Sequence, residues 1–458
     1  MRRGQFPVSS LPAWCGLNDV TFYDVEVAKV EDRGYGLVAE RDLFNEDDNV
    51  EIPTLLTIPK DLVLCTEAVE EHARENKDFR QLLDVAGRQS ARGDILLFLM
   101  AQLVLSSPDY TSGQGASTPW SQYFSLLPTD VPVPTMWTES ELSLLRGTSL
   151  ETAVAAKLAA LTKEFDVIRA KTENIPQWYE LLSIDEEITV SDWILLDALY
   201  RSRSLGLPKS GESMVPCLDL VNHSNSATAY FEETGKDEVA LLLRSGSKVP
   251  QGSEVTIDYG TDKSAAEMLF SYGFIDEQSA AKSMVLRLES MDDDPLSKAK
   301  LHVFGAPPVL EIKDTDSGVP QWSAPFAYLM CLNQEDGLDF RVLQETDGTR
   351  HLRMFWQDID ITDQSDTIKD RIDKHELRQV FQLRTVMVVL EVLNQRISGI
   401  VASETIPGLA RASVWHAAAH LKRVESELLE RTLQELENQV SPSPSSSNLN
   451  PGIEPPAF

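Results

Sequence analysis

The chain has 458 residues, of which 42% are hydrophobic, and a formal net charge of −31. This length allows a large buried core and two or three domains. So strong a negative charge would repel a phosphate backbone, which argues against nucleic-acid binding and favours a basic protein as partner. No window approaches the roughly 20 consecutive apolar residues of a membrane span, and no secretion signal is recognisable. We therefore expect no membrane association and a location in the cytosol or nucleus.

The cysteines are far apart in the sequence and form no CxxC or Cys/His ligand group. This pattern suggests neither a structural zinc site nor a disulfide framework. We expect reduced and mostly buried thiols, and no bound metal. The four positions are Cys15, Cys65, Cys217 and Cys331.

The first part of the chain predicts short strands followed by helices. Residues 22–30 alternate apolar and polar side chains, Gly34-Tyr35-Gly36 breaks the pattern, and residues 37–43 resume it. Helical periodicity then runs from about residue 66 to residue 205. Its clearest segments are 95–105, 150–165 and 188–200. A helical block is thus predicted to interrupt a strand-rich domain.

Strand patterns return after Met214 and are separated by typical turn residues. The predicted strands are 215–221, 229–232, 239–243 and 254–259. Ser264 and Glu267 then have the spacing of a capping box, which predicts a short helix that Gly273 ends.

Beyond about residue 280 the pattern is again mainly helical, with long periodic segments at 379–397 and 410–436. This predicts a second domain. Residues 289–376 contain 19 acidic and 9 basic side chains, which a solvated face explains as well as a docking surface does. Residues 441–458 are rich in Ser, Pro and Asn, so a disordered tail is predicted.

Polar residues stand at the ends of two predicted strands. One run of apolar residues leads directly into Asn222, His223 and Ser224, and about 40 residues later another ends in Tyr259. Taken alone, the first group is a turn, and a single His beside a core strand is more often structural than catalytic. The order of all the pieces is far more specific: Asn-His, hairpins, a strand with Tyr-Gly, and a short helix with Tyr-Gly-Phe.

This arrangement resembles the C-terminal half of a SET domain. It is most similar to the branch typified by the plant Rubisco large-subunit lysine methyltransferase, because Gly34 to Ala39, the helical insert, Trp137 to Thr148 and Arg201 to Ser204 also match that branch. The absence of a cysteine cluster fits a zinc-free branch. The resemblance implies an α+β fold with a SET domain at 18–280, a helical insert at about 66–205, and a mainly α-helical substrate-binding domain at 281–440.

The resemblance also implies S-adenosyl-L-methionine as cofactor and assigns roles to individual residues. Tyr259 would orient the acceptor amine beside the transferring methyl group, and Tyr272 would line the acceptor channel, although packing alone explains Tyr272 nearly as well. The implied cofactor-binding residues are Arg33, Gly34, Tyr35, Gly36, Arg203, Asp219, Asn222, His223 and Tyr259. Arg33 departs from the family pattern, because relatives often have Glu at this position.

The implied activity is protein-lysine N-methylation of a non-histone protein, such as a ribosomal protein or a translation factor. Lysine has a solution pKa of about 10.4, so the site must help to deprotonate it. Two alternatives remain open. The chain could be a catalytically idle scaffold of the same fold, or it could methylate histidine, because a relative in this branch acts on actin. We expect a monomer.

Overall fold

The computed structural model describes residues 1–45, 52–109, 117–276, 281–289, 294–315, 317–344, 348–403 and 410–440. The chain divides into two compact units. The first comprises Met1–Thr138, Thr152–Lys263 and Glu267–Phe274, and the second comprises Glu139–Glu151, Ser264–Ala266 and Ile275–Phe458. The predicted tail at 441–458 lies outside the described residues, and the predicted boundaries at 18, 280 and 440 stay predictions.

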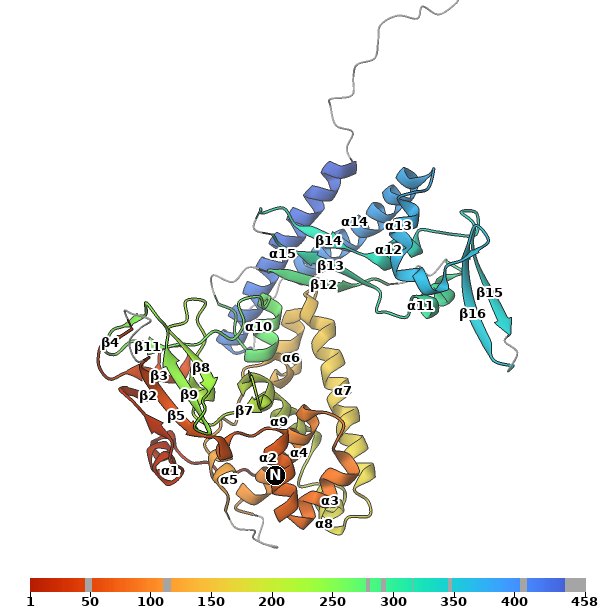
Figure 1. Cartoon of the computed structure of the whole chain (residues 1–458). Helices are drawn as coiled ribbons and strands as arrows, with labels where there is room; N and C mark the ends of the chain where they lie inside the picture. Colours follow the sequence, from red (N-terminus) through yellow and green to blue (C-terminus); the bar gives the residue numbers. More distant parts are fainter. Residues whose placement is uncertain are drawn as a thin grey trace, which may run out of the picture. The chain divides into compact units, whose positions relative to one another are not determined.

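The first unit combines small antiparallel sheets with helices (Figure 1). Its strands are β1 (Thr21–Phe22), β2 (Val25–Val30), β3 (Gly34–Ala39), β4 (Leu43–Phe44), β5 (Thr54–Pro59), β6 (Ser204–Leu207), β7 (Gly211–Met214), β8 (Ala229–Glu233), β9 (Glu238–Leu243), β10 (Lys248–Val249) and β11 (Glu254–Val255). Its helices are α1 (Leu11–Leu17), α2 (Thr66–Glu75), α3 (Lys77–Ala86), α4 (Ala91–Ser106), α5 (Pro119–Phe124), α8 (Pro176–Tyr179) and α9 (Val190–Arg203), and it contains most of α7 (Ser149–Lys171) and α10 (Ala265–Tyr272).

Strands from both ends of the unit pair with each other. The larger sheet has the order β1-β5-β9-β8, and a second sheet has the order β11-β3-β2. Leu55, Leu56 and Ile58 of β5 are buried, and so is β9 from Val239 to Leu243, so these central strands are covered on both faces. The helical insert therefore separates strands that are neighbours in space, as the sequence predicts.

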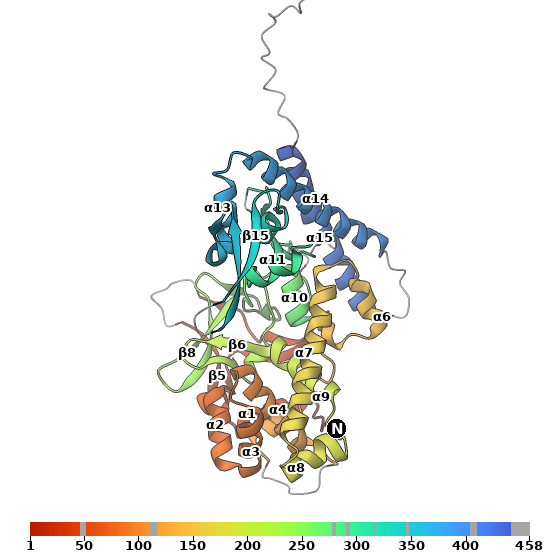
Figure 2. The same cartoon turned by 90° about the vertical axis from the view of Figure 1, so that its right-hand side faces the viewer.

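Helix α4 lies at the centre of the insert. The Ser90 side chain accepts a hydrogen bond from Gly93 N and caps its start. The segment from Asp94 to Val104 is buried throughout, which is typical of a helix surrounded by protein. Helices α2, α3, α5 and α9 contact it, and Figure 2 shows α2, α3, α4 and α9 together in this unit.

The second unit contains more strand than the sequence pattern predicts. Its elements are α6 (Glu139–Leu142), β12 (Ser283–Arg287), α11 (Ser297–Phe304), β13 (Val309–Lys313), β14 (Gln321–Ser323), α12 (Pro325–Met330), β15 (Leu338–Gln344), β16 (Arg350–Trp356), β17 (Ile359–Asp360), α13 (Ile368–Ile372), α14 (Arg378–Ala402) and α15 (Ala412–Val440). They include two sheets, β12-β13-β14 and β15-β16-β17. The pattern does not predict these strands because β12, β13, β14 and β17 are short and β15 exposes most of its side chains, which leaves a weak apolar signal. The α+β class is confirmed.

Both long helices predicted for this unit are present. Phe381, Thr385, Val389 and Leu393 of α14 are buried and recur every four residues, while Leu383 and Met387 are exposed. By length and hydropathy alone, α14 could cross a membrane. One such helix is weak evidence, because core helices of other proteins pass the same test.

Residues before α7 are held tightly within the second unit. The backbone of Gly147 has a φ of +82°, and a Cβ there would lie 2.6 Å from Ile400 N. Ser149 donates two hydrogen bonds to Glu425 of α15, one from its hydroxyl and one from its backbone N at 2.9 Å. Burial raises the pKa of Glu425 to about 7.

Two predicted strands near the candidate site are wrong in part. Residues 215–221 form a short 3₁₀ helix, η6 (Leu218–Leu220), because Cys217 has a φ of +67° that no strand permits. The strand predicted at 254–259 pairs regularly only over β11, and the chain then leaves the sheet. Both deviations occur where the candidate site lies.

Candidate active site

The two segments that carry the predicted polar residues pair directly. His223 and Ile257 form an isolated parallel bridge. In it, Ile257 N donates to Asn222 O at 3.0 Å, and Ser224 N donates to Ile257 O at 3.1 Å. Because Tyr259 follows Ile257 by two residues, the bridge places Tyr259 beside Asn222 and His223.

His223 is buried and fixed by its hydrogen bonds. The backbone N of Tyr259 donates to its Nδ1 at 3.0 Å. Since Nδ1 accepts this hydrogen bond, the proton of a neutral His223 ring lies on Nε2. Its ring lies 5.3 Å from the ring of Tyr259 and 6.2 Å from that of Phe274. The imidazole thus belongs to an aromatic cluster and has one orientation.

Tyr259 is held as a neutral phenol. Its hydroxyl donates to the Val221 carbonyl at 2.7 Å. Burial raises the pKa of the Tyr259 hydroxyl well above its ordinary value, and the positive charge of Arg203 only partly opposes this. The ring of Tyr272 lies 4.6 Å from that of Tyr259. The two tyrosines of the predicted acceptor channel therefore form a pair.

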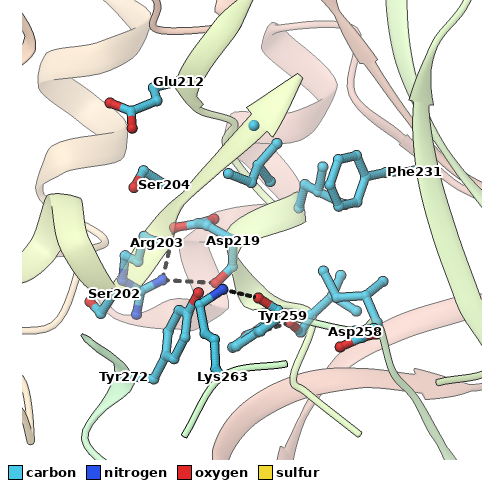
Figure 3. Close-up of a pocket in the computed structure, with 15 residues that line it drawn as sticks. Ser202, Arg203, Ser204, Glu212, Asp219, Phe231, Asp258, Tyr259, Lys263 and Tyr272 are labelled. Atoms are coloured by element: carbon cyan, nitrogen blue, oxygen red, sulfur yellow. Dashed lines mark hydrogen bonds and ion pairs between the residues drawn. The ribbon is translucent and has the colours of Figure 1, made fainter. Parts of the chain in front are cut away.

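A cavity of about 290 Å³ opens beside these tyrosines (Figure 3). Asp219 accepts from Arg203 Nη1 at 2.8 Å through its carboxylate and at 3.2 Å through its backbone oxygen. The lining residues are Ser202, Arg203, Ser204, Leu205, Gly206, Glu212, Leu218, Asp219, Val221, Phe231, Ile257, Asp258, Tyr259, Lys263 and Tyr272.

Lys263 is a second cation of this cavity, and the sequence motif gave no sign of its role. Its ammonium donates to the Tyr259 carbonyl and lies 5.7 Å from the centroid of the Tyr272 ring. Figure 3 shows Lys263 and Arg203 on the same side of the cavity as the two tyrosines. Lys263 therefore places a cation beside the two tyrosines, whereas the positive charge of Arg203 is paired with Asp219.

Tyr123 supports the cavity from behind and was also not predicted. Its hydroxyl donates to the Asp219 carboxylate and accepts from Cys217 N at 2.9 Å. Burial raises the pKa of Tyr123 well above its ordinary value, so the hydroxyl keeps its proton. The Cys217 thiol lies 3.7 Å from that of Cys15, and both cysteines are buried and free, as expected. The contacts of Tyr123 join residues about 95 positions apart, which local periodicity does not reveal.

The glycine turn lies at the other side of Asn222. Asp32 and Gly34 have φ angles of +58° and +81°, which close the β2–β3 hairpin. A Cβ on Gly36 would lie 2.5 Å from Glu254 Oε1 and 2.8 Å from Asn222 Nδ2. Only glycine allows this approach. The Asn222 side chain donates to Glu254 Oε1 at 2.6 Å and to the Tyr35 carbonyl at 3.4 Å.

The predicted site residues thus form two adjoining groups. One surrounds the turn and contains Arg33, Gly34, Tyr35, Gly36, Asn222 and His223. The other lines the cavity and contains Arg203, Asp219, Tyr259 and Tyr272. The carboxylate of Asp219 is 1% exposed and already bound to Arg203 and Tyr123, so in this structure it positions Arg203. The Tyr259 backbone links the groups through His223.

The sequence is similar to several characterised proteins, although no family model matches it. SET domain-containing protein 8 of Schizosaccharomyces pombe is 28% identical over 324 residues, which cover 70% of each chain. The Rubisco large-subunit N-methyltransferase of Pisum sativum is 28% identical over 290 residues, or 60% of this chain and 53% of the pea enzyme. The actin-histidine N-methyltransferase of Danio rerio is 22% identical over 346 residues, or 73% of this chain and 54% of that protein. The chain thus spans about half the length of the pea and zebrafish proteins.

The fold is similar to that of solved structures of Rubisco LSMT. The structure of that enzyme bound to AdoMet matches with a TM-score of 0.66 and 21% identity, covering 95% of this chain and 92% of the other. Its SET domain bound to lysine and AdoHcy matches with a TM-score of 0.65 and 21% identity, covering 94% and 91%. The chain is thus similar in sequence to SET-domain proteins and Rubisco large-subunit methyltransferases, and it shares the fold of Rubisco LSMT.

Proposed function

We propose that this chain is an S-adenosylmethionine-dependent protein methyltransferase that acts on a lysine of a non-histone protein. One observation carries the proposal. The parallel bridge joins Asn222 and His223 to Tyr259, and Tyr259 in turn lines the cavity beside Tyr272. A region with polar groups for one ligand and a cavity that contains two tyrosines thus meet at a single residue, as a reaction between two bound molecules requires.

The residues around the glycine turn fit this cofactor. A Cβ on Gly34 would meet no atom within 4 Å, so the turn borders open space. Asn222 and Glu254 provide polar side chains at its edge, and His223 carries its proton on Nε2. When bound, the cofactor supplies an electrophilic methyl group on a sulfonium. The chain's part is to hold the ligand and to keep water away.

A lysine acceptor in this cavity must either arrive uncharged or lose its proton there. Lysine is protonated at neutral pH, and a protonated amine has no lone pair to react. Lys263 places positive charge beside the two tyrosines, which disfavours a second cation there and lowers the pKa of an incoming amine. Tyr259 donates its own proton to Val221, so its oxygen can accept a hydrogen bond from that amine.

Transfer of labelled methyl groups tests the activity. Purified chain would be incubated with methyl-labelled S-adenosylmethionine and an extract of cells that lack this protein. We expect labelled protein with the wild type, and a rate lower by roughly 10²–10³ for Tyr259→Phe, as for loss of one preorganised polar group. Tyr179→Phe, at an exposed tyrosine, is the matched control. An unlabelled extract, or equal rates for all three proteins, would refute the proposal.

Histidine is the second candidate acceptor, because actin-histidine N-methyltransferases are among the relatives. Imidazole has an ordinary pKa of about 6.5 and is largely neutral at pH 7, so it needs little help to lose a proton. The cations Arg203 and Lys263 would also suit a neutral ring. Mass spectrometry of the labelled product decides, since it locates the methyl group on lysine or on histidine.

An inactive scaffold of the same fold is the remaining alternative. Calorimetry separates it from an enzyme, because a scaffold needs no cofactor. We expect S-adenosylmethionine to bind to the purified wild-type chain. No heat of binding, together with no methyl transfer to any protein, would favour the scaffold.

We further propose that the partner is a basic protein, such as a ribosomal protein or a translation factor, in the cytosol or nucleus. The support is the net charge of −31, which attracts basic surfaces through long-range forces. We propose that the chain works as a monomer without nucleic acid or membrane. Comparing methylated proteins in cells with and without the chain would name the substrate.

A further inference from the structure

An ion pair lies beside the glycine turn and involves residues from both ends of the first unit. Arg33 Nη1 lies 3.4 Å from Glu254 Oε2 and donates to the His223 carbonyl at 3.1 Å. The other carboxylate oxygen, Oε1, accepts from Asn222 Nδ2 at 2.6 Å. The Glu254 carboxylate thus joins Arg33 and Asn222, and the Arg33 guanidinium extends the contacts to His223.

The pair keeps capacity for a ligand. The Glu254 side chain is only 14% exposed, whereas that of Arg33 is 48% exposed. Each carboxylate oxygen accepts two hydrogen bonds, and a guanidinium has five N–H donors. Among the described residues, Arg33 uses only Nη1, for both of its contacts. Its remaining donors and the second lone pairs of Glu254 can therefore bind another group.

A fixed positive charge beside a fixed negative charge complements a zwitterion. An amino acid end carries an ammonium and a carboxylate on one carbon, so its two charges are separated by a few ångströms, like those of Arg33 and Glu254. Interactions between charges are also stronger in a partly dehydrated site than in water. Because Gly36 has no side chain, Glu254 and Asn222 can lie close to its backbone.

We propose that Arg33 and Glu254 bind the amino acid end of the cofactor. Glu254 accepts from its ammonium, and Arg33 donates to its carboxylate. This assignment rests on the proposed function. It also accounts for Arg33, the residue that departs from the family pattern, because the negative charge at the turn comes from β11 instead.

Calorimetry with cofactor fragments tests the two contacts separately. The ligands are S-adenosylmethionine, its decarboxylated form, which keeps the ammonium, and 5′-methylthioadenosine, which lacks the amino acid end. We expect Glu254→Gln to weaken binding of the first two by about tenfold or more, the usual effect of losing a charged hydrogen bond, with 5′-methylthioadenosine unchanged. Gln still accepts from Asn222. Glu26→Gln, at an exposed position of β2, is the matched control.

Arg33→Gln should behave differently. We expect this variant to lower the affinity for S-adenosylmethionine by about tenfold and to leave the affinity for the decarboxylated form unchanged. Equal losses for all three ligands, or no loss with either variant, would overturn the assignment while leaving the proposed function intact. A wild-type chain that binds none of the three compounds would overturn both.

Discussion

Replacement of Tyr123 by Phe removes one hydroxyl that serves two buried partners. The oxygen accepts from Cys217 N at 2.9 Å, and its proton is donated to Asp219. Cys217 is fully buried, so no water can take the place of the lost acceptor. A buried N–H without a partner costs about 1–3 kcal/mol, and a lost hydrogen bond to a charged group about 1.5–3 kcal/mol. Arg203 still neutralises Asp219, so we expect a total loss of about 3 kcal/mol.

Urea unfolding and hydrogen exchange measure this loss. The two units can unfold separately, so each transition must be assigned before a free energy is derived. Exchange at the Cys217 amide should accelerate in Tyr123→Phe, because that amide loses its acceptor. Tyr23→Phe, at a tyrosine that is 42% exposed, should change the free energy of unfolding by less than about 0.5 kcal/mol. If Tyr123→Phe matched this control in both measurements, the double role of the hydroxyl would be refuted.

Two further predictions concern the second unit. Gly147→Ala should lower the free energy of unfolding by roughly 3 kcal/mol, since the new Cβ adds a left-handed backbone penalty to a clash with Ile400. Gly318→Ala, in the same unit, has a φ of +76° but meets no atom within 4 Å, so it should lose only the backbone penalty of about 1–2 kcal/mol in the same urea titration, and equal effects would contradict the clash. Glu425 has a folded pKa of about 7 against an ordinary 4.5, so the folded state binds the proton more tightly and stability should fall by about 3 kcal/mol as pH rises from 4.5 to 7. Glu425→Gln should remove this contribution to the pH dependence of stability. If the variant kept the wild-type pH profile, titration of Glu425 would not be its cause.

The sequence predicts the frame of the site better than its contacts. Asn222, His223 and Tyr259 could be found because each ends an apolar run and their order is specific. Glu254 and Tyr123 could not be found, since their roles arise from distant pairing. The apolar pattern also wrongly predicts a strand at residues 215–221, because a hydrophobic pattern does not reveal the positive φ of Cys217.

In the second unit, periodicity found the long helices and missed the strands. Helix α14 buries one side chain in every four, which is a clear signal over 25 residues. Strands β12, β13, β14 and β17 are short, and β15 and β16 expose many of their side chains, so few buried apolar residues mark them. Gly147 and Glu141 lie in the segment from Trp137 to Thr148, which the sequence marks only by its resemblance to the family. The structure gives them physical reasons, a close approach to Ile400 and an ion pair with Arg411.

The bridge between His223 and Ile257 also determines when the site can form. Tyr259 contacts His223, which lies 36 positions earlier in the chain. The contact between Arg33 and His223 closes a second loop of 190 positions. Loops of this length must close before their contacts stabilise them, so such a site forms late in folding. A nascent chain on the ribosome cannot bind cofactor until the segment with Tyr259 has emerged. Premature termination between Gly36 and Tyr259 leaves a fragment that has the glycine turn but no working site.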